Sequence, residues 1–147
     1  MANSLCGTYE YVAPEVLNKH GYGKSCDWWS FGCVLYEMLT AIPPFYSKKR
    51  EELLSKIRFK SPNFYNFHSQ ESIDLISQLL NKDPLRRLGT AGGAADIKKH
   101  PFFNGIDWDQ MLKKKLPTPY KPLLDSNCDT KHFAEEFSNL PIESPPG

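Results

Sequence analysis

The sequence predicts a mainly α-helical fold around one buried central helix, followed by an extended C-terminal tail. The central helix is indicated by residues 27–40, where apolar side chains occupy nearly every side of a helical repeat. Residues 69–80 repeat apolar positions at the spacing of an amphipathic helix. The tail is indicated by six prolines from Pro117 to Pro146, because proline cannot continue a regular helix.

The composition favours a globular protein without a strong charge or a membrane segment. Acidic and basic residues nearly cancel to a net charge of +1, so we expect no nucleic-acid partner. No apolar run reaches the roughly 18 residues that span a bilayer, and the first residues do not resemble a signal peptide. The four cysteines match no zinc-binding spacing, so we expect reduced thiols, no metal and a cytoplasmic or nuclear protein.

The chain opens with residues that suit an extended loop and then a short helix. Gly7 gives the loop a position free of side-chain strain. Ala13 is pushed away from the helical region because it precedes proline. Pro14 then fits the first turn of a short helix, and Glu15 stands beside the positive end of the helix dipole.

The next segment ends in Gly-Lys-Ser, which imitates the end of a phosphate-binding P-loop. That motif would need a glycine where Asn18 stands, and it would follow a buried strand. We therefore expect a turn into the central helix, with Ser25 as the residue that caps its N-terminus. A P-loop nucleotide binder remains one of three hypotheses, and titration of the purified chain with ATP would test it.

The central helix, residues 27–40, carries two apolar stripes and only two acids, Asp27 and Glu37. Apolar residues on nearly all sides predict a helix buried in a large core. Asp27 suits the first turn of a helix in any protein, because the dipole favours an acid there. Glu37 lies in an otherwise apolar stretch, so its carboxylate needs a partner.

Two further helices are predicted after the Pro43-Pro44 break. The first covers residues 48–56, is mostly exposed and turns Leu53, Leu54 and Ile57 inward. Residues 58–67 show no period and predict a loop. Ser69 can then cap the helix whose inward face is formed by Ile73, Ile76, Leu79 and Leu80.

Shorter elements are predicted from there to the tail. A glycine-rich turn at Gly92 leads into a short helix that ends near His100. Asp107 is placed to cap a last helix through Gln110, three residues further on. From Leu116 the prolines predict an extended segment without a regular fold.

Several of these segments together resemble a protein kinase. Ser4 to Leu17 resembles a kinase activation segment, and its Ala13-Pro14-Glu15 matches the A-P-E signature. Residues 6–11, Cys-Gly-Thr-Tyr-Glu-Tyr, are similar to the version in AGC-group Ser/Thr kinases. The buried helix resembles the central helix F of the C-lobe, and residues 129–137 resemble the AGC tail, nearest to protein kinase B-like members.

The resemblance implies a fold of two parts. Residues 1–115 would form the lower half of a kinase C-lobe, and residues 116–147 would form the AGC tail. An alternative for the tail is a generic proline-rich linker. The loops and motifs that bind ATP, its magnesium ions and the catalytic base are not found in the sequence. We therefore expect ATP and magnesium only in a parent kinase, and this chain to be inactive.

The resemblance also assigns regulatory and supporting residues. Ser4 corresponds to the activating phosphosite, a substrate of an upstream kinase, and Ser144 to the turn-motif phosphosite of the tail. Asp27 would support the backbone of the catalytic loop without transferring protons. Glu15 and Arg87 would form a buried ion pair, with Arg86 as a competing partner. The alternative leaves both charges in water.

The substrate site implied by the resemblance lies in the activation segment. Thr8 would help to seat the acceptor hydroxyl, and Leu5, Tyr9 and Val12 would line the pocket for the next substrate residue. Tyr9 departs from the proline of several AGC members. Glu10 and Glu37 would face basic residues before the acceptor, which predicts a basophilic Ser/Thr kinase. For Glu37, an ion pair with an arginine or lysine of this chain is the alternative.

Two further expectations concern the chain by itself. The central helix would lack part of its usual cover, which leaves an apolar patch and favours self-association. The remaining hypothesis is a non-catalytic module that binds substrates or regulators of kinases through the same surface. The reading frame upstream of Met1 would separate this module from a kinase, because only a kinase frame would encode the Gly-rich and H-R-D motifs.

Overall fold

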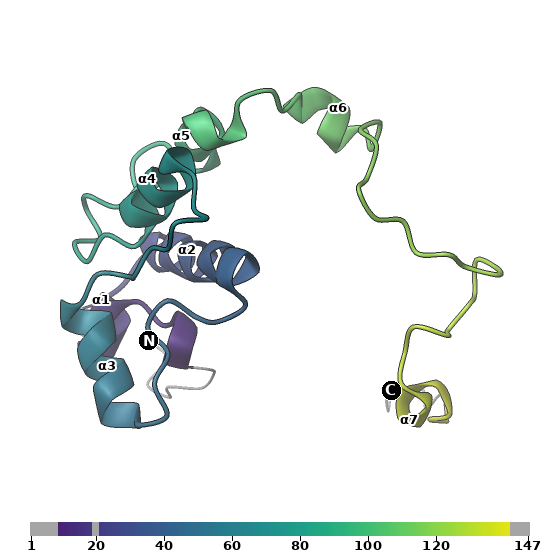
Figure 1. Cartoon of the computed structure of the whole chain (residues 1–147), viewed down its shortest axis with the longest axis horizontal. Coiled ribbons are helices and arrows are strands. Elements are labelled where there is room, and N and C mark those ends of the chain that lie inside the picture. The colour runs from purple at the N-terminus through teal and green to yellow at the C-terminus, as the bar shows by residue number, and fades with distance from the viewer. Residues whose placement is uncertain (1–8, 19–20, 142–147) are drawn as a thin grey trace, which may run out of the picture. The chain divides into compact units, whose positions relative to one another are not determined.

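The computed structural model describes residues 9–18 and 21–141, and within these ranges it contains helices and no strand (Figure 1). This confirms the predicted mainly α fold. The elements are η1 (Tyr9–Tyr11), α1 (Pro14–Leu17), α2 (Ser25–Thr40), α3 (Arg50–Phe59), α4 (Gln70–Leu79), α5 (Ala94–Lys98), η2 (Pro101–Phe103), α6 (Trp108–Leu112) and α7 (Glu135–Ser138).

The chain divides into two compact units, one ending at Ile106 and the other beginning at Asp107. The core and the candidate site belong to the first unit. The second unit contains α6 and α7, joined by residues without a regular fold. Its Asp107 carboxylate caps α6 by accepting the Gln110 N–H at 3.0 Å, as the sequence predicted. The predicted domain boundary after residue 115 stays a prediction.

Helix α2 is the centre of the first unit, and it starts earlier than expected. The prediction that Ser25 caps this helix was wrong, because Ser25 is its first residue and Lys24 precedes it without a side-chain cap. The carbonyls of Gly23 and Lys24 already accept the N–H groups of Cys26 and Asp27 at 3.2 Å each. These backbone hydrogen bonds satisfy N–H groups in the first turn of α2, so the helix starts without a cap from the Ser25 hydroxyl.

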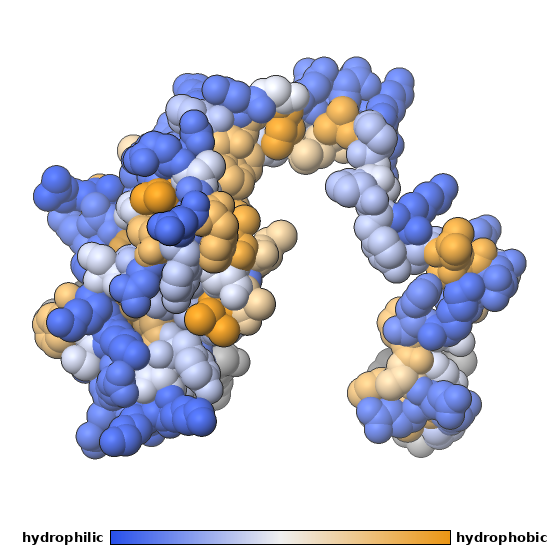
Figure 2. Space-filling model, viewed as in Figure 1, coloured by the Kyte–Doolittle hydropathy of each residue, from blue (hydrophilic) through white to orange (hydrophobic). Residues whose placement is uncertain are grey.

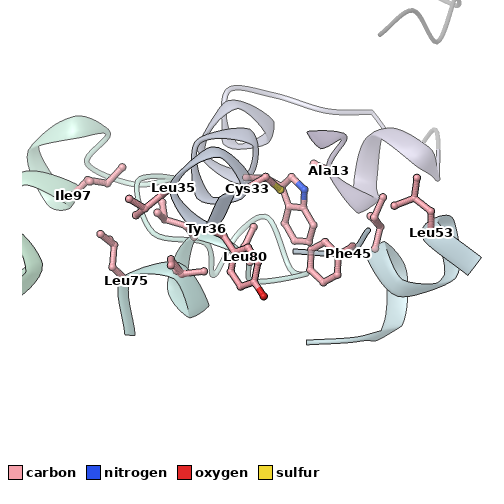
Figure 3. Packing of buried hydrophobic residues seen from close by; sticks show 13 residues of the cluster. Ala13, Cys33, Leu35, Tyr36, Phe45, Leu53, Leu75, Leu80 and Ile97 are labelled. Atoms are coloured by element: carbon pink, nitrogen blue, oxygen red, sulfur yellow. The ribbon is translucent and has the colours of Figure 1, made fainter. Parts of the chain in front are cut away.

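The core forms where α2 packs on α4. The fully buried residues of α2 include Trp29, Cys33 and Tyr36, and α4 contributes Leu75, Ile76 and Leu79. In Figure 3, Leu35 of α2 points toward Leu75 and Ile97. Ser69 caps α4 as predicted, since its hydroxyl accepts the Ser72 N–H at 3.1 Å. The predicted inward face is confirmed for Ile76, Leu79 and Leu80, whereas Ile73 is only partly buried and the fully buried Leu75 was not predicted.

Gly32 allows this close packing of α2 against α4, and we expect Gly32→Ala to lower the free energy of unfolding by about 1–3 kcal/mol. A Cβ at Gly32 would lie 2.8 Å from the Cβ of Leu79, where neither helix can move without opening the core. Gly23→Ala is the matched control, because a Cβ at Gly23 meets nothing within 4 Å. Urea unfolding of both variants measures the difference. Equal stabilities would contradict the close-packing argument.

The opposite side of α2 is not covered within the described residues. Met38 is 77% exposed, and Val34 and Leu39 are also exposed. In the space-filling view, hydrophobic residues gather over the region of α2 and α4 (Figure 2). The prediction of a helix buried on all sides therefore holds for one face of α2, and the other face presents apolar side chains.

Helix α3 packs on α1 and η1, and it starts and ends later than predicted. The prediction placed it at residues 48–56, whereas the helix runs from Arg50 to Phe59. Lys49 has an extended backbone, with φ −99° and ψ 121°, so the helix begins only at the next residue, and the Ser47 hydroxyl accepts the Lys49 N–H at 3.2 Å. Leu53 and Ile57 are buried as expected, whereas Leu54 is only partly buried and does not belong to the core cluster.

Lys82 connects α3 with the centre of the core. Its ammonium donates to the carbonyl of Ile57 at 2.7 Å. The same nitrogen lies 4.6 Å from the ring centre of Trp29 and 4.0 Å from that of Phe45. Cation–π attraction therefore accompanies the hydrogen bond at the junction of α2, α3 and the loop between them.

Candidate functional site

The predicted site residues fall partly within the described residues. Ser4, Leu5, Thr8 and Ser144 lie outside them. Tyr9 and Glu10 belong to η1, Val12 follows it, and Glu37 lies in the last turns of α2. Glu15 lies in the first turn of α1, Asp27 lies in the first turn of α2, and Arg87 lies in the loop after α4.

Tyr11 fastens η1 to α2 through Glu37. The Tyr11 hydroxyl donates to Oε2 of Glu37 at 2.5 Å, and the Ser30 hydroxyl donates to the Tyr11 carbonyl at 2.9 Å. The hydrogen bond to the Glu37 carboxylate and burial together raise the pKa of Tyr11 to about 12. Both bonds come from one face of α2, so they fix where the chain segment of η1 lies.

The structure gives Glu37 a partner that sequence reasoning missed. Glu37 makes no ion pair with any described residue, so the alternative of an arginine or lysine partner within the chain is not found there. The Tyr11 phenol takes one carboxylate oxygen, Oε2. The other oxygen, Oε1, accepts no hydrogen bond from the described part of the chain. The signal available in the sequence was Tyr11, whose hydroxyl can donate a hydrogen bond to a carboxylate.

Replacing Glu37 with glutamine is expected to lower the pKa of Tyr11 from about 12 toward its ordinary value of 10.0. The neutral phenol is favoured by donating to a carboxylate, and an amide oxygen without charge favours it less. Titration of ring-labelled tyrosine by NMR between about pH 9 and 12 measures the shift. Glu10→Gln is the control, because Glu10 acts on Tyr11 only through a weaker charge interaction. An unchanged pKa in Glu37→Gln would exclude this hydrogen bond in solution.

Arg50, the first residue of α3, covers Tyr9. Its guanidinium donates to the Tyr9 hydroxyl at 2.7 Å, and its central carbon lies 4.5 Å from the ring centre. Arg50 is exposed and forms no ion pair within the described residues. A positive charge therefore lies beside the segment that the sequence assigned to the residue after the acceptor. Sequence reasoning did not single out Arg50, because an arginine in the first turn of an exposed helix is an ordinary surface residue.

Arg87 and Glu15 lie together as the deepest charges of the site. The guanidinium donates from Nη1 to Oε1 of Glu15 at 2.6 Å and from Nη2 to Oε2 at 2.9 Å. Arg87 also donates to the carbonyls of Ser25 at 2.8 Å and Asn81 at 3.1 Å. Both charged residues are buried, whereas Arg86 is exposed. One arginine thus joins α1, the start of α2 and the loop after α4.

Asp27 occupies the first turn of α2 and is exposed. Its Oδ1 accepts a weak hydrogen bond from the Cys26 thiol at 3.7 Å. Burial and the charge of Asp27 raise the pKa of that thiol. The carboxylate therefore faces outward from the helix N-terminus, where the dipole favours it.

Within residues 9–18 and 21–141, no group of three or more His, Cys, Asp or Glu side chains is placed to hold a metal ion. A search of the same residues for a helix long and apolar enough to cross a membrane found none.

The sequence has relatives among known proteins. Residues 1–103 match the family described as protein kinase domain. The chain is 46% identical over 97% of its length to the serine/threonine-protein kinase gad8 of Schizosaccharomyces pombe. It is 45% identical over 92% of its length to a RAC family serine/threonine-protein kinase homolog of Dictyostelium discoideum. It is 43% identical over 98% of its length to ribosomal protein S6 kinase alpha-4 of Homo sapiens.

These matches cover only a part of each relative. The chain spans 25% of gad8, 30% of the Dictyostelium protein and 20% of the human kinase. The family match over residues 1–103 contains η1, the Glu15–Arg87 pair and all but the last three residues of the first compact unit. The matches therefore identify the family of this part, and kinase activity is proposed below for a complete enzyme.

Proposed function

The chain belongs to the protein kinase family and is of AGC type, and from this premise we propose that it forms the substrate-binding part of a Ser/Thr kinase. The complete enzyme would transfer the γ-phosphate of ATP to serine or threonine of proteins. ATP and magnesium would be held by residues other than the described ones. The role of this chain is to position the acceptor segment, since phosphoryl transfer depends mainly on positioning and electrostatics.

The observation that carries the proposal is the anchoring of η1 to α2. Tyr11 and Ser30 join the two elements through the hydrogen bonds at 2.5 and 2.9 Å. Both the side chain and the backbone carbonyl of Tyr11 are bonded to α2, so the segment is held in one conformation. It would therefore lose little conformational entropy when it binds a peptide. The Glu15–Arg87 pair supports the same segment from its C-terminal end.

We further propose that the kinase prefers basic residues before the acceptor. Glu37 supports this preference because its Oε1 is not used by the described residues and can accept from a substrate guanidinium. Glu10, in the same short helix as Tyr9, adds a second negative charge. The protein surface that would face the substrate residue after the acceptor is positive, because the Arg50 guanidinium lies over the Tyr9 ring. An acidic residue should therefore be favoured there over a basic one.

A chimera tests this function with the chain present in full. The matching residues of gad8 would be replaced by this chain, and the purified chimera would be assayed with ATP, magnesium and serine peptides. We expect phosphorylation, with a preference for arginine over alanine before the acceptor that falls in Glu37→Gln. Arg50→Ala is expected to change only the preference after the acceptor. A folded chimera without activity would contradict the kinase assignment, and unchanged arginine discrimination in Glu37→Gln would remove Glu37 from the substrate site.

Regulation by phosphorylation is a further part of the proposal. Ser4 would be the activating site of an upstream kinase, and Ser144 the phosphosite of the tail. A phosphate adds about −1.5 to −2 charges, which order a loop by pairing with arginines or lysines. Ser4→Ala in the same chimera is expected to lower the activity. Full activity of this variant would show that the assignment of Ser4 is wrong.

A further inference from the structure

A pocket of about 340 Å³ lies between the loop after α2 and the end of α3. The prolines Pro43 and Pro44 and the aromatic rings of Tyr36 and Phe45 contribute its apolar lining. Tyr36 and Phe45 belong to the core cluster, so this lining is held in place by the packed interior (Figure 3). The volume is at the lower end of the range of about 300–1,000 Å³ that is typical of ligand pockets.

Two half-exposed tyrosines also line the pocket. Tyr46 is 49% exposed and Tyr65 is 44% exposed. The Tyr65 ring is stacked on Phe67 with ring centres 5.5 Å apart and an angle of 9° between the planes, which limits its movement. Aromatic surfaces that are rigid and half-exposed release water when a second aromatic or aliphatic side chain covers them. The pocket is therefore suited to an apolar side chain.

The charge at the pocket is positive. Lys56 and Lys60 are among the lining residues, and no carboxylate is. Lys56 is already engaged, because its ammonium contacts Glu52 at 2.8 Å and donates to the Tyr46 carbonyl at 3.0 Å. The Lys60 ammonium has no ion pair or hydrogen bond with any described residue. It is available to pair with an anion of the occupant.

The backbone along the pocket is also available. Lys60 has an extended conformation with φ −108° and ψ 145°, and residues 60–64 form no helix or hydrogen-bonded turn. Within the described chain, the N–H groups of Ser61 and Asn63 donate to no other residue. The Asn63 carbonyl accepts the Tyr36 hydroxyl at 2.7 Å, which ties the segment to α2. Free N–H groups two residues apart, such as those of Ser61 and Asn63, can donate to an extended partner chain.

We propose that the pocket and residues 60–65 bind an extended acidic peptide segment of a partner protein. An aromatic side chain of that segment occupies the space between Tyr46 and Tyr65, a neighbouring carboxylate pairs with Lys60, and its backbone accepts from Ser61 and Asn63. The surface shares no residue with η1 or Glu37, so this inference goes beyond the proposed kinase function.

A fluorescein-labelled peptide with one phenylalanine flanked by two aspartates on each side is the probe. Its anisotropy in a titration with the full chain gives the affinity. We expect Lys60→Glu to weaken binding about tenfold, because it reverses the charge that faces the peptide. Lys99→Glu changes the net charge equally at an exposed position outside the pocket and should leave the affinity within about twofold. Lys60→Ala serves as a milder second variant and should give an intermediate loss.

Amide NMR of the labelled chain locates the bound peptide. The signals of Ser61 and Asn63 should shift during the titration. Equal weakening by Lys60→Glu and Lys99→Glu would overturn the proposal, as would equal binding of a peptide with asparagines in place of the aspartates. Absence of binding at millimolar peptide, or shifts at Tyr9 to Val12 in place of Ser61 and Asn63, would overturn it too.

Discussion

Replacing Arg87 with alanine is expected to lower the free energy of unfolding by about 3–5 kcal/mol. Arg87 is 2% exposed and its partner Glu15 is 8% exposed, so the change leaves a carboxylate buried without a cation. The carbonyls of Ser25 and Asn81 lose their donor at the same time. Urea unfolding of the full chain, followed by circular dichroism, measures the loss.

Two variants control this measurement. Arg86→Ala removes the same charge from the neighbouring exposed position and should change stability by no more than about 0.5 kcal/mol. Arg87→Lys keeps the charge but cannot form the two parallel hydrogen bonds to Glu15, so an intermediate loss is expected. If Arg87→Ala and Arg86→Ala were equally stable, the buried ion pair would not support the fold.

Replacing Trp29 with alanine is expected to lower the free energy of unfolding by about 3–5 kcal/mol. Trp29 is fully buried on α2, and its ring is stacked on Phe45 with ring centres 5.5 Å apart. Lys82 and Arg87 lie over the same ring at 4.6 and 5.2 Å. The substitution therefore opens a cavity and removes the aromatic partner of two cations. Urea unfolding again gives the magnitude.

Trp29→Phe separates the aromatic contacts from the indole N–H. That N–H is buried and has no hydrogen-bond partner among the described residues. Phenylalanine keeps a ring for Phe45 and Lys82 and removes the unpaired donor, so its loss of stability should be clearly smaller than that of alanine. Equal losses in the two variants would mean that contacts with the ring contribute little.

The sequence predicted those helix boundaries and helix faces that depend only on residues close together in the chain. Ser69 and Asp107 each cap a helix by accepting an N–H three residues further on, so both caps lie within one turn of sequence. The amphipathic repeat of residues 69–80 likewise identified most of the buried face of α4, although it included the partly buried Ile73 and missed Leu75. The start of α3 was misplaced because Lys49 has an extended backbone, and the periodic pattern of residues 48–56 does not specify where the helical backbone begins.

The candidate site depended more on contacts between distant residues. The sequence indicated that Glu37 needs a partner, but Tyr11 is 26 residues away and only the fold brings the two together. Glu15 and Arg87 were paired by family resemblance, since no local pattern joins them. Arg50 and Lys60 are exposed cations of ordinary appearance, and their importance becomes visible only beside Tyr9 and the pocket.

The separation of Glu15 and Arg87 has a kinetic consequence. Their side chains meet across 72 residues of chain, so forming the pair requires closing a long loop. Helices α2 and α4 pack on each other across shorter stretches of chain, as Gly32 and Leu79 do, and we expect them to assemble before the pair does. Arg87→Ala should then leave the folding rate nearly unchanged and speed up unfolding, which stopped-flow measurements in urea would resolve. The ion pair would act as a latch that slows the opening of the native protein.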